Sequence, residues 1–159
     1  MLKIVSRSAR ETQRLGKRLG ELSQAGDIFL LVGDLGSGKT CLTQGIALGL
    51  GVTENVFSPS FVLIREYRGR LRLYHIDFYR LNSVEEIADL GLEDYLYGGG
   101  VCVIEWAEKG MAVLPGENLL ITLEYLSEKE RSLTFEARGE RYADLVRALE
   151  PLCRGKRVA

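Results

Sequence analysis

The apolar positions of this chain form two different patterns, continuous runs and runs with helical spacing. Ile28–Val32 and Val101–Ile104 are apolar throughout, which is typical of strands covered on both faces in a parallel sheet. Leu15, Leu19 and Leu22 recur at helical spacing, so a helix with one apolar face is expected before the first of these strands. The chain therefore has the pattern of an α/β protein.

Several helices carry recognisable start signals. Ser8 and Glu11, and again Ser83 and Glu86, have the spacing of a capping box, in which two side chains satisfy free amide donors at a helix start. A further helix is expected to begin near Lys39, and a last helix has one apolar face. The residues of that face are Tyr142, Leu145 and Leu149.

Further strands are expected in the middle and towards the end of the chain. Residues 61–67 and 71–77 are strand-like and are joined by Arg68-Gly69-Arg70, which predicts a hairpin. Residues 119–126 and 132–137 predict two more strands around a charged turn. Because no linker or internal repeat separates these elements, we expect one domain over 1–152 and a loose basic tail over 153–159.

Composition and charge narrow the class of protein. Of the 159 residues 46% are hydrophobic and 27% charged, which excludes a disordered chain, a collagen-like fibre and a coiled coil. The longest apolar run, Ile28–Val32, is too short to span a bilayer, and the N-terminus lacks the apolar segment of a secretory signal. A formal charge of −1 argues against binding nucleic acid through the overall field. We expect a cytoplasmic globular domain without membrane contact.

The number and spacing of the three cysteines are consistent with a cytoplasmic location. Cys41, Cys102 and Cys153 are widely spaced and odd in number, so they indicate neither a disulfide framework nor a zinc site. Cys41 and Cys102 lie inside apolar patterns and are interpreted as small buried hydrophobic residues.

A glycine-rich segment after the first buried strand carries the strongest chemical signal. Its residues are Gly33, Asp34, Leu35, Gly36, Ser37, Gly38, Lys39 and Thr40, and they match G-x-x-x-x-G-K-[ST] in full. The glycines let successive amides point at phosphate oxygens, and the following helix adds its positive end. Lys39 is placed to reach the β- and γ-phosphates, and Thr40 offers a hydroxyl to Mg²⁺. A P-loop NTPase domain is therefore expected.

Hydrolysis also needs a carboxylate near the metal and a group that orients water. Glu105 ends a buried strand, where ligands bind in open α/β sheets, and resembles the carboxylate that holds Mg²⁺ directly or through water. Asp77 ends the hairpin strand and is a candidate for the metal or for the water. We expect Asp77, Glu105 and Lys39 to be the catalytic residues, with the roles of the two acids left open.

Other residues near these acids admit a functional and a structural interpretation. His75 shares a strand face with Asp77, and is a candidate for proton handling or a hydrogen-bonded structural histidine. Arg80 is a weak candidate for sensing the γ-phosphate, and Trp106 either packs against the site or fills the core. Aromatic residues also alternate with charged ones, a pattern of nucleic-acid binding or of a half-buried sheet face. These aromatic residues are Phe61, Tyr67, Tyr74, Phe78 and Tyr79.

Taken together, four motifs resemble the TsaE (YjeE) family, the bacterial ATPases of tRNA threonylcarbamoyladenosine biosynthesis. The motifs are the glycine-rich loop 33–40, then Ser58-Pro59-Ser60, Tyr74-His75-Ile76-Asp77-Phe78-Tyr79-Arg80-Leu81 and Ile104-Glu105-Trp106. Their order and spacing agree over nearly the whole chain. The second pair of motifs is much more specific than the phosphate loop.

The resemblance implies a small P-loop NTPase with a mixed, mostly parallel sheet between helices. It implies ATP and Mg²⁺ as cofactors, with Thr40 and Glu105 as metal ligands, and a switch-like loop at 58–60. It adds Cys41 and Thr12 to the loop residues as nucleotide contacts. The family acts with the TsaB and TsaD proteins and reaches tRNA through that complex, so weak ATP hydrolysis without the partners is expected.

Two other functions stay open. A small-molecule kinase of the P-loop class needs a second substrate pocket and a lid of basic residues. A nucleotide-gated binding module uses ATP only to set its shape. Replacing Asp77 or Glu105 separates a catalytic switch, which loses hydrolysis but binds ATP, from a module that has no hydrolysis to lose.

Overall fold

The computed structural model describes residues 1–59 and 62–153. In this part of the chain, seven strands form one sheet in the order β1-β7-β6-β2-β5-β4-β3. The strands are β1 (Leu2–Ser6), β2 (Ile28–Val32), β3 (Ile64–Tyr67), β4 (Leu73–Asp77), β5 (Val101–Glu105), β6 (Asn118–Tyr125) and β7 (Arg131–Arg138). The helices are α1 (Ala9–Leu22), α2 (Lys39–Gly49), α3 (Val84–Ala88), α4 (Glu93–Leu96) and α5 (Glu140–Cys153), with 3₁₀ turns η1 (Ala107–Lys109) and η2 (Met111–Val113).

The centre of the sheet is parallel and its edges are antiparallel. β6, β2, β5 and β4 run parallel to one another, whereas β3 pairs antiparallel with β4, and β7 pairs antiparallel with both β6 and β1. Parallel strands bring their carboxyl ends to one edge of the sheet, where open α/β sheets bind ligands. The predicted mixed, mostly parallel sheet between helices is confirmed.

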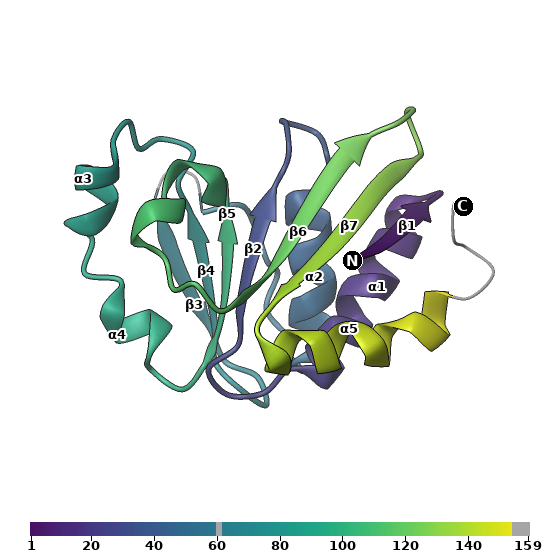
Figure 1. Ribbon diagram of the computed structural model, residues 1–159, viewed down its shortest axis with the longest axis horizontal. Coiled ribbons are helices and arrows are strands. Elements are labelled where there is room, and N and C mark those ends of the chain that lie inside the picture. The colour runs from purple at the N-terminus through teal and green to yellow at the C-terminus, as the bar shows by residue number, and fades with distance from the viewer. Residues whose placement is uncertain (60–61, 154–159) are drawn as a thin grey trace.

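Alternate residues of the central strands enter two separate apolar clusters. Phe29 and Leu31 of β2 pack with residues of α1, α2 and α5. Ile28 and Leu30 pack on the opposite face, with residues of α3, α4 and the 3₁₀ turns. Figure 1 shows α1 and α2 side by side behind the sheet, while α3 and α4 lie near β3 and β4. Because both faces are covered, the continuous apolar run of β2 is explained.

Glycines bring α1 and α2 into backbone contact. A Cβ added at Gly20 would lie 2.2 Å from the carbonyl oxygen of Ile46, and one added at Gly45 would lie 2.2 Å from that of Gln13. A Cβ added at Gly16 or Gly49 would lie 2.4 or 2.1 Å from a carbonyl oxygen of the facing helix. Any side chain at these four positions would push the helices apart. The pair therefore holds α2, and the loop before it, firmly over the sheet.

Most predicted elements are confirmed. Ser8 and Ser83 each accept a hydrogen bond from the amide three residues later, as a capping box requires. The hairpin forms with both strands shorter than predicted, because the first begins at Ile64 and the second at Leu73. β1, α4 and both 3₁₀ turns were not predicted from the sequence. Residues 60–61 and 154–159, which include Phe61 and most of the expected basic tail, lie outside the described residues.

Among residues 1–59 and 62–153, each helix is too short or too polar to cross a bilayer.

Candidate functional site

The glycine-rich loop connects β2 to α2 and is shaped by two glycines. Gly38 is the N-cap of α2 with φ of 103°, a left-handed conformation that side chains rarely adopt. Gly33 allows a close approach to β6, because an added Cβ would lie 2.4 Å from the carbonyl oxygen of Leu123. The loop consequently turns tightly and aims the N-terminal end of α2, with its free amides, at the carboxyl edge of the sheet.

Lys39 is the cation of this loop. Its ammonium group donates to the carbonyls of Gly33 and, at 2.9 Å, of Asp34. The ammonium also lies 4.2 Å from the centre of the Trp106 ring. Burial lowers the pKa of Lys39, and the carboxylate of Glu105 opposes that shift. The side chain is thus a partly desolvated positive charge, a state in which attraction to an anion is strengthened.

Glu105 joins the end of β5 to the start of α2. Its carboxylate is buried and accepts hydrogen bonds from the Thr40 hydroxyl at 3.1 and 3.3 Å. The hydroxyl of Thr43 lies 3.4 Å from the same carboxylate, and Nε2 of His75 contacts it from β4. Thr40 and Glu105, the two residues expected as metal ligands, thus lie in contact with each other. His75 is wholly buried and pairs with Glu105 across the strands.

Asp77 lies beside Glu105 because the parallel register pairs these two residues. Its Oδ1 accepts a hydrogen bond of 2.7 Å from the Tyr79 amide, and its Oδ2 accepts one of 3.2 Å from the Ser58 hydroxyl. Asp77 is therefore held by the chain that follows β4 and by the loop at 58–59. Ser60, the last residue of the expected switch-like loop, lies outside the described residues.

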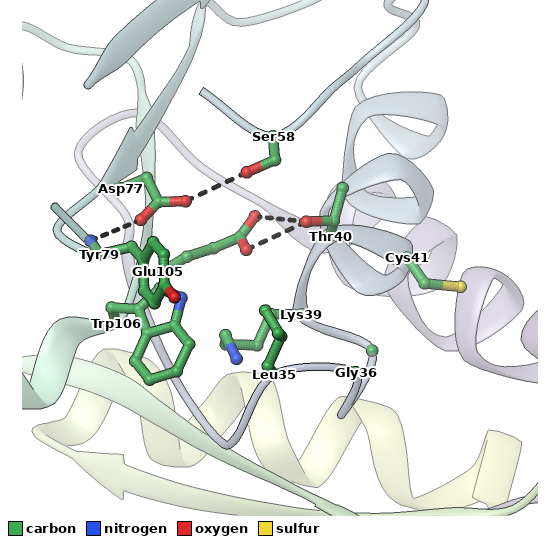
Figure 2. Close-up of a pocket in the computed structure, with 11 residues that line it drawn as sticks. Leu35, Gly36, Lys39, Thr40, Cys41, Ser58, Asp77, Tyr79, Glu105 and Trp106 are labelled. Atoms are coloured by element: carbon green, nitrogen blue, oxygen red, sulfur yellow. Dashed lines mark hydrogen bonds between the residues drawn. The ribbon is translucent and has the colours of Figure 1, made fainter. Parts of the chain in front are cut away.

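These groups line a pocket of about 330 Å³ at the carboxyl edge of the sheet. Figure 2 shows Lys39, Glu105 and Asp77 in this pocket, with the Thr40 and Ser58 hydroxyls directed at the two carboxylates. The lining residues are Leu35, Gly36, Gly38, Lys39, Thr40, Cys41, Ser58, Asp77, Tyr79, Glu105 and Trp106. One cation, two acids and a helix N-terminus are suited to hold a polyphosphate and its metal ion.

Two aromatic residues form one wall of the pocket. The rings of Tyr79 and Trp106 lie 5.0 Å apart, and Trp106 adopts a left-handed backbone conformation with φ of 57°. Trp106 lines the pocket and is also packed, partly buried, against the apolar cluster on the opposite face of the sheet, so both interpretations of this residue hold. Tyr67 and Tyr74 are buried. They follow the pattern of a half-buried sheet face and form no exposed stacking platform.

A second pocket, of about 400 Å³, adjoins the first and shares Gly38 and Cys41 with it. It is lined by Ser8, Ala9, Thr12, Gly38, Cys41, Glu128, Lys129 and Arg131. Thr12 is buried and its hydroxyl lies 2.7 Å from that of Ser6. The pocket brings α1 next to the glycine-rich loop, so the expected nucleotide contacts Thr12 and Cys41 share one cavity.

The cysteines differ from one another. Cys102 is buried, and burial raises the pKa of its thiol to about 12. Cys41 is only half-buried and lines both pockets. The interpretation as a buried hydrophobic residue is therefore confirmed for Cys102 and wrong for Cys41, because the first turn of α2 opens onto the site. Burial also raises the pKa of Cys41, and nearby Arg131 opposes that shift.

Not every predicted residue lines the main pocket. Gly33, Asp34 and Ser37 are absent from its lining, and their oxygen atoms accept hydrogen bonds from the ammonium of Lys39. Arg80 is exposed and does not line the pocket. Thr43 was not predicted as a site residue, although its place one turn after Thr40 on the same helix is a detectable signal.

Arg131 was also missed. It donates to the carbonyl oxygen of Gly36 in the glycine-rich loop at 3.1 Å. The two residues are 95 positions apart in the sequence. Such a contact has no local sequence signal.

The donor set fits Mg²⁺. Thr40 and Glu105 offer a hydroxyl and a carboxylate in contact with each other, which are oxygen donors of the hard type that Mg²⁺ prefers. Within residues 1–59 and 62–153, three or more His, Cys, Asp or Glu side chains nowhere gather as a metal site. A magnesium ion held by one or two protein oxygens, with phosphate and water completing its shell, agrees with this arrangement.

Comparisons with known proteins agree with the geometry. A family model described as threonylcarbamoyl adenosine biosynthesis protein TsaE matches residues 6–133. The tRNA threonylcarbamoyladenosine biosynthesis protein TsaE of Treponema pallidum (strain Nichols) is 46% identical over 133 residues, covering 84% of this chain and 98% of that protein. The protein of the same name from Bacillus subtilis (strain 168) is 45% identical over 140 residues, covering 87% of each.

A solved structure is also similar. The crystal structure of Bacillus subtilis YdiB superposes with a TM-score of 0.83 at 39% sequence identity, covering 95% of both chains. The resemblance therefore extends over the fold as well as the sequence.

Proposed function

Because the chain belongs to the TsaE family of tRNA threonylcarbamoyladenosine biosynthesis proteins, we propose that it binds ATP with Mg²⁺ and hydrolyses it for that modification. The observation that carries this proposal is the contact between Thr40 and Glu105. It joins the helix after the phosphate loop to the end of a buried strand, in the pocket that also holds Lys39.

The residues of the loop bind and orient the triphosphate. The amides at the start of α2 and the ammonium of Lys39 face the phosphate oxygens, as in P-loop proteins generally. Thr40 and Glu105 hold the magnesium ion, and Thr43 and His75 fix the Glu105 carboxylate in place. The ion, when bound, neutralises charge that develops on the transferred phosphoryl group.

Asp77 takes the second role that hydrolysis needs. Its carboxylate is buried beside Glu105 and is fixed by the Tyr79 amide and the Ser58 hydroxyl. A carboxylate in this state is a hydrogen-bond acceptor that orients an attacking water. We therefore assign the metal to Glu105 and the water to Asp77.

The nucleoside end of ATP occupies the second pocket. That pocket shares Gly38 and Cys41 with the phosphate site and is bounded by Thr12. The two pockets, of about 330 and 400 Å³, share a border and are each in the size range of small-molecule sites, so one can take the phosphate chain and the other the nucleoside.

The partners are the TsaB and TsaD proteins, and tRNA is reached through their complex. Phe57 and Val62 flank the loop that carries Ser58, and both side chains are more than half exposed. Exposed apolar residues beside an active site are typical of a surface that another protein covers. A partner at this loop would influence Asp77 through Ser58.

The proposal is tested by phosphate release from ATP with Mg²⁺, first by the chain alone and then with TsaB, TsaD and tRNA. We expect slow release that the partners accelerate and that Lys39→Ala abolishes. Lys17→Ala, on the exposed face of α1, is the matched control and keeps the activity. Release that ignores the partners but rises with a small hydroxyl compound would indicate a kinase. ATP binding without release, with or without the partners, would indicate a nucleotide-gated binding module.

A further inference from the structure

The β6–β7 turn lies against the glycine-rich loop. Arg131, the first residue of β7, donates from Nε to the carbonyl of Gly36 at 3.1 Å. Its Nη1 donates back into the turn, to the carbonyls of Ser127 at 2.6 Å and Glu130 at 2.9 Å. The guanidinium also lies 4.5 Å from the centre of the Tyr125 ring. One side chain thus connects the turn to the loop.

The guanidinium is fixed on the turn side. Ser127 and Glu130 bond to each other through backbone and side-chain groups, so the carbonyls that receive Arg131 belong to a rigid turn. In the part of the chain that the structure describes, Arg131 forms no ion pair with a carboxylate. A planar fork with fixed donors is suited to hold several carbonyls at once.

Gly36, the loop residue that Arg131 contacts, has few other neighbours. Gly36 is exposed with φ of 80°, and the space around it holds nothing within 4 Å of an added Cβ. Loops of this kind lose conformational freedom when they bind phosphate, and that loss weakens binding. A hydrogen bond that restricts the free loop reduces this cost.

We propose that Arg131 is a positioning residue of the nucleotide site, which holds the glycine-rich loop in its phosphate-binding shape through the carbonyl of Gly36. This inference rests on the proposed function, because it assumes that the loop binds phosphate. The restriction of the loop depends on the planar arrangement of the guanidinium N–H donors and not on the positive charge alone. Lysine at position 131 keeps the charge but loses Nε–H and the planar fork, so it does not replace arginine.

The first experiment measures affinity for ATP, ADP and AMP by calorimetry in Arg131→Lys and Arg131→Ala. We expect ATP and ADP to bind about tenfold more weakly in both variants, the scale of one hydrogen bond to a charged group. AMP stays within about twofold in Arg131→Lys, because its single phosphate uses less of the loop and the lysine keeps the aliphatic stem that lines the nucleoside pocket. Arg131→Ala removes that lining as well, so AMP binding is compared in Arg131→Lys. Arg138→Lys and Arg138→Ala are the matched controls, since Arg138 ends the same strand and is half-exposed beside Glu136.

The second experiment measures hydrogen exchange of the amides at 33–38 without nucleotide, and so does not depend on ATP binding. We expect exchange to rise at least about threefold in Arg131→Lys and to stay unchanged in Arg138→Lys. Arg131→Lys keeps the aliphatic stem, so it reports even where Arg131→Ala does not fold.

Several outcomes would overturn the inference. These are unchanged loop exchange in Arg131→Lys, wild-type ATP affinity in that variant, or a loss of AMP affinity equal to the loss for ATP. Failure of the proposed function is distinguishable, because wild-type protein would then bind ATP no better than Lys39→Ala does. In that case the hydrogen-exchange measurement still tests whether Arg131 restricts the glycine-rich loop.

Discussion

The two faces of the central sheet use the same strands in different ways. On the face covered by α1 and α2, β4 and β5 bury His75, Asp77 and Glu105. On the face covered by α3 and α4, the neighbouring residues Ile76 and Ile104 enter an apolar cluster. Polar chemistry and apolar packing therefore alternate residue by residue at the ends of these strands.

The difference follows from what covers each face. Buried carboxylates are tolerated only with hydrogen-bond or ionic partners. The close approach of α2 supplies such partners to Glu105 through Thr40 and Thr43. The short helices α3 and α4 present mainly apolar side chains, Ile87 and Leu96 among them, and so cover only apolar residues. A site on this fold needs the tightly held helix on one side.

The largest expected effect separates two neighbouring residues of β5. Glu105→Gln removes the negative charge but keeps the shape, so ATP turnover should fall about a thousandfold while ATP still binds. Ile104→Val, on the other face, should leave turnover unchanged and cost about 1 kcal/mol of stability. Steady-state phosphate release and calorimetry of ATP binding measure the first, and urea unfolding measures the second. Equal loss of turnover in both variants would contradict the division between the faces.

The next effect concerns how the helices are held. Gly20→Leu places a side chain against the carbonyl of Ile46 and should destabilise the fold by about 3 kcal/mol. Ile87→Val on the opposite face should cost only about 1 kcal/mol, because it removes a single methyl group. Urea unfolding measures both, with Arg14→Leu on the exposed side of α1 as the control for adding leucine. A small cost for Gly20→Leu would mean that the helices separate easily.

The smallest effect is a difference in thiol reactivity. In a Cys153→Ser background, iodoacetamide at pH 8 should alkylate Cys41 and leave Cys102 unmodified, as peptide mass spectrometry would show. Burial raises the pKa of Cys102 to about 12, so it has almost no thiolate at that pH. The pKa of Cys41 lies above its ordinary 9.0, so the alkylation rate should still be rising beyond pH 9. ATP with Mg²⁺ should slow the reaction, and labelling of Cys102 at an equal rate would contradict its burial.

Elements with strong local patterns could be predicted from the sequence. β2 was predicted with both ends correct, because a strand covered on both faces leaves a continuous apolar run, here bounded by Asp27 and Gly33. β1 was missed, because this edge strand of five residues pairs with β7 from the far end of the chain. α4 was missed because four residues form too short a segment to show a helical period.

The candidate site divides in the same way. The residues of the glycine-rich loop are contiguous, so their spacing alone predicts phosphate binding. The pairing of His75 with Glu105 was not predicted, since a spacing of two residues identifies a strand face but not the neighbour across the sheet. Arg131 reaches Gly36 only because β7 begins beside the loop, which tertiary structure decides.

The glycine contact between α1 and α2 also restricts how the protein can evolve. Where two side chains meet, growth of one can be offset by a smaller residue at the other. At Gly20 and Gly45 the neighbour is a main-chain oxygen, which no substitution can make smaller. Mutations at these glycines therefore have no second-site suppressor within the interface, and selection can recover the contact only by reversion.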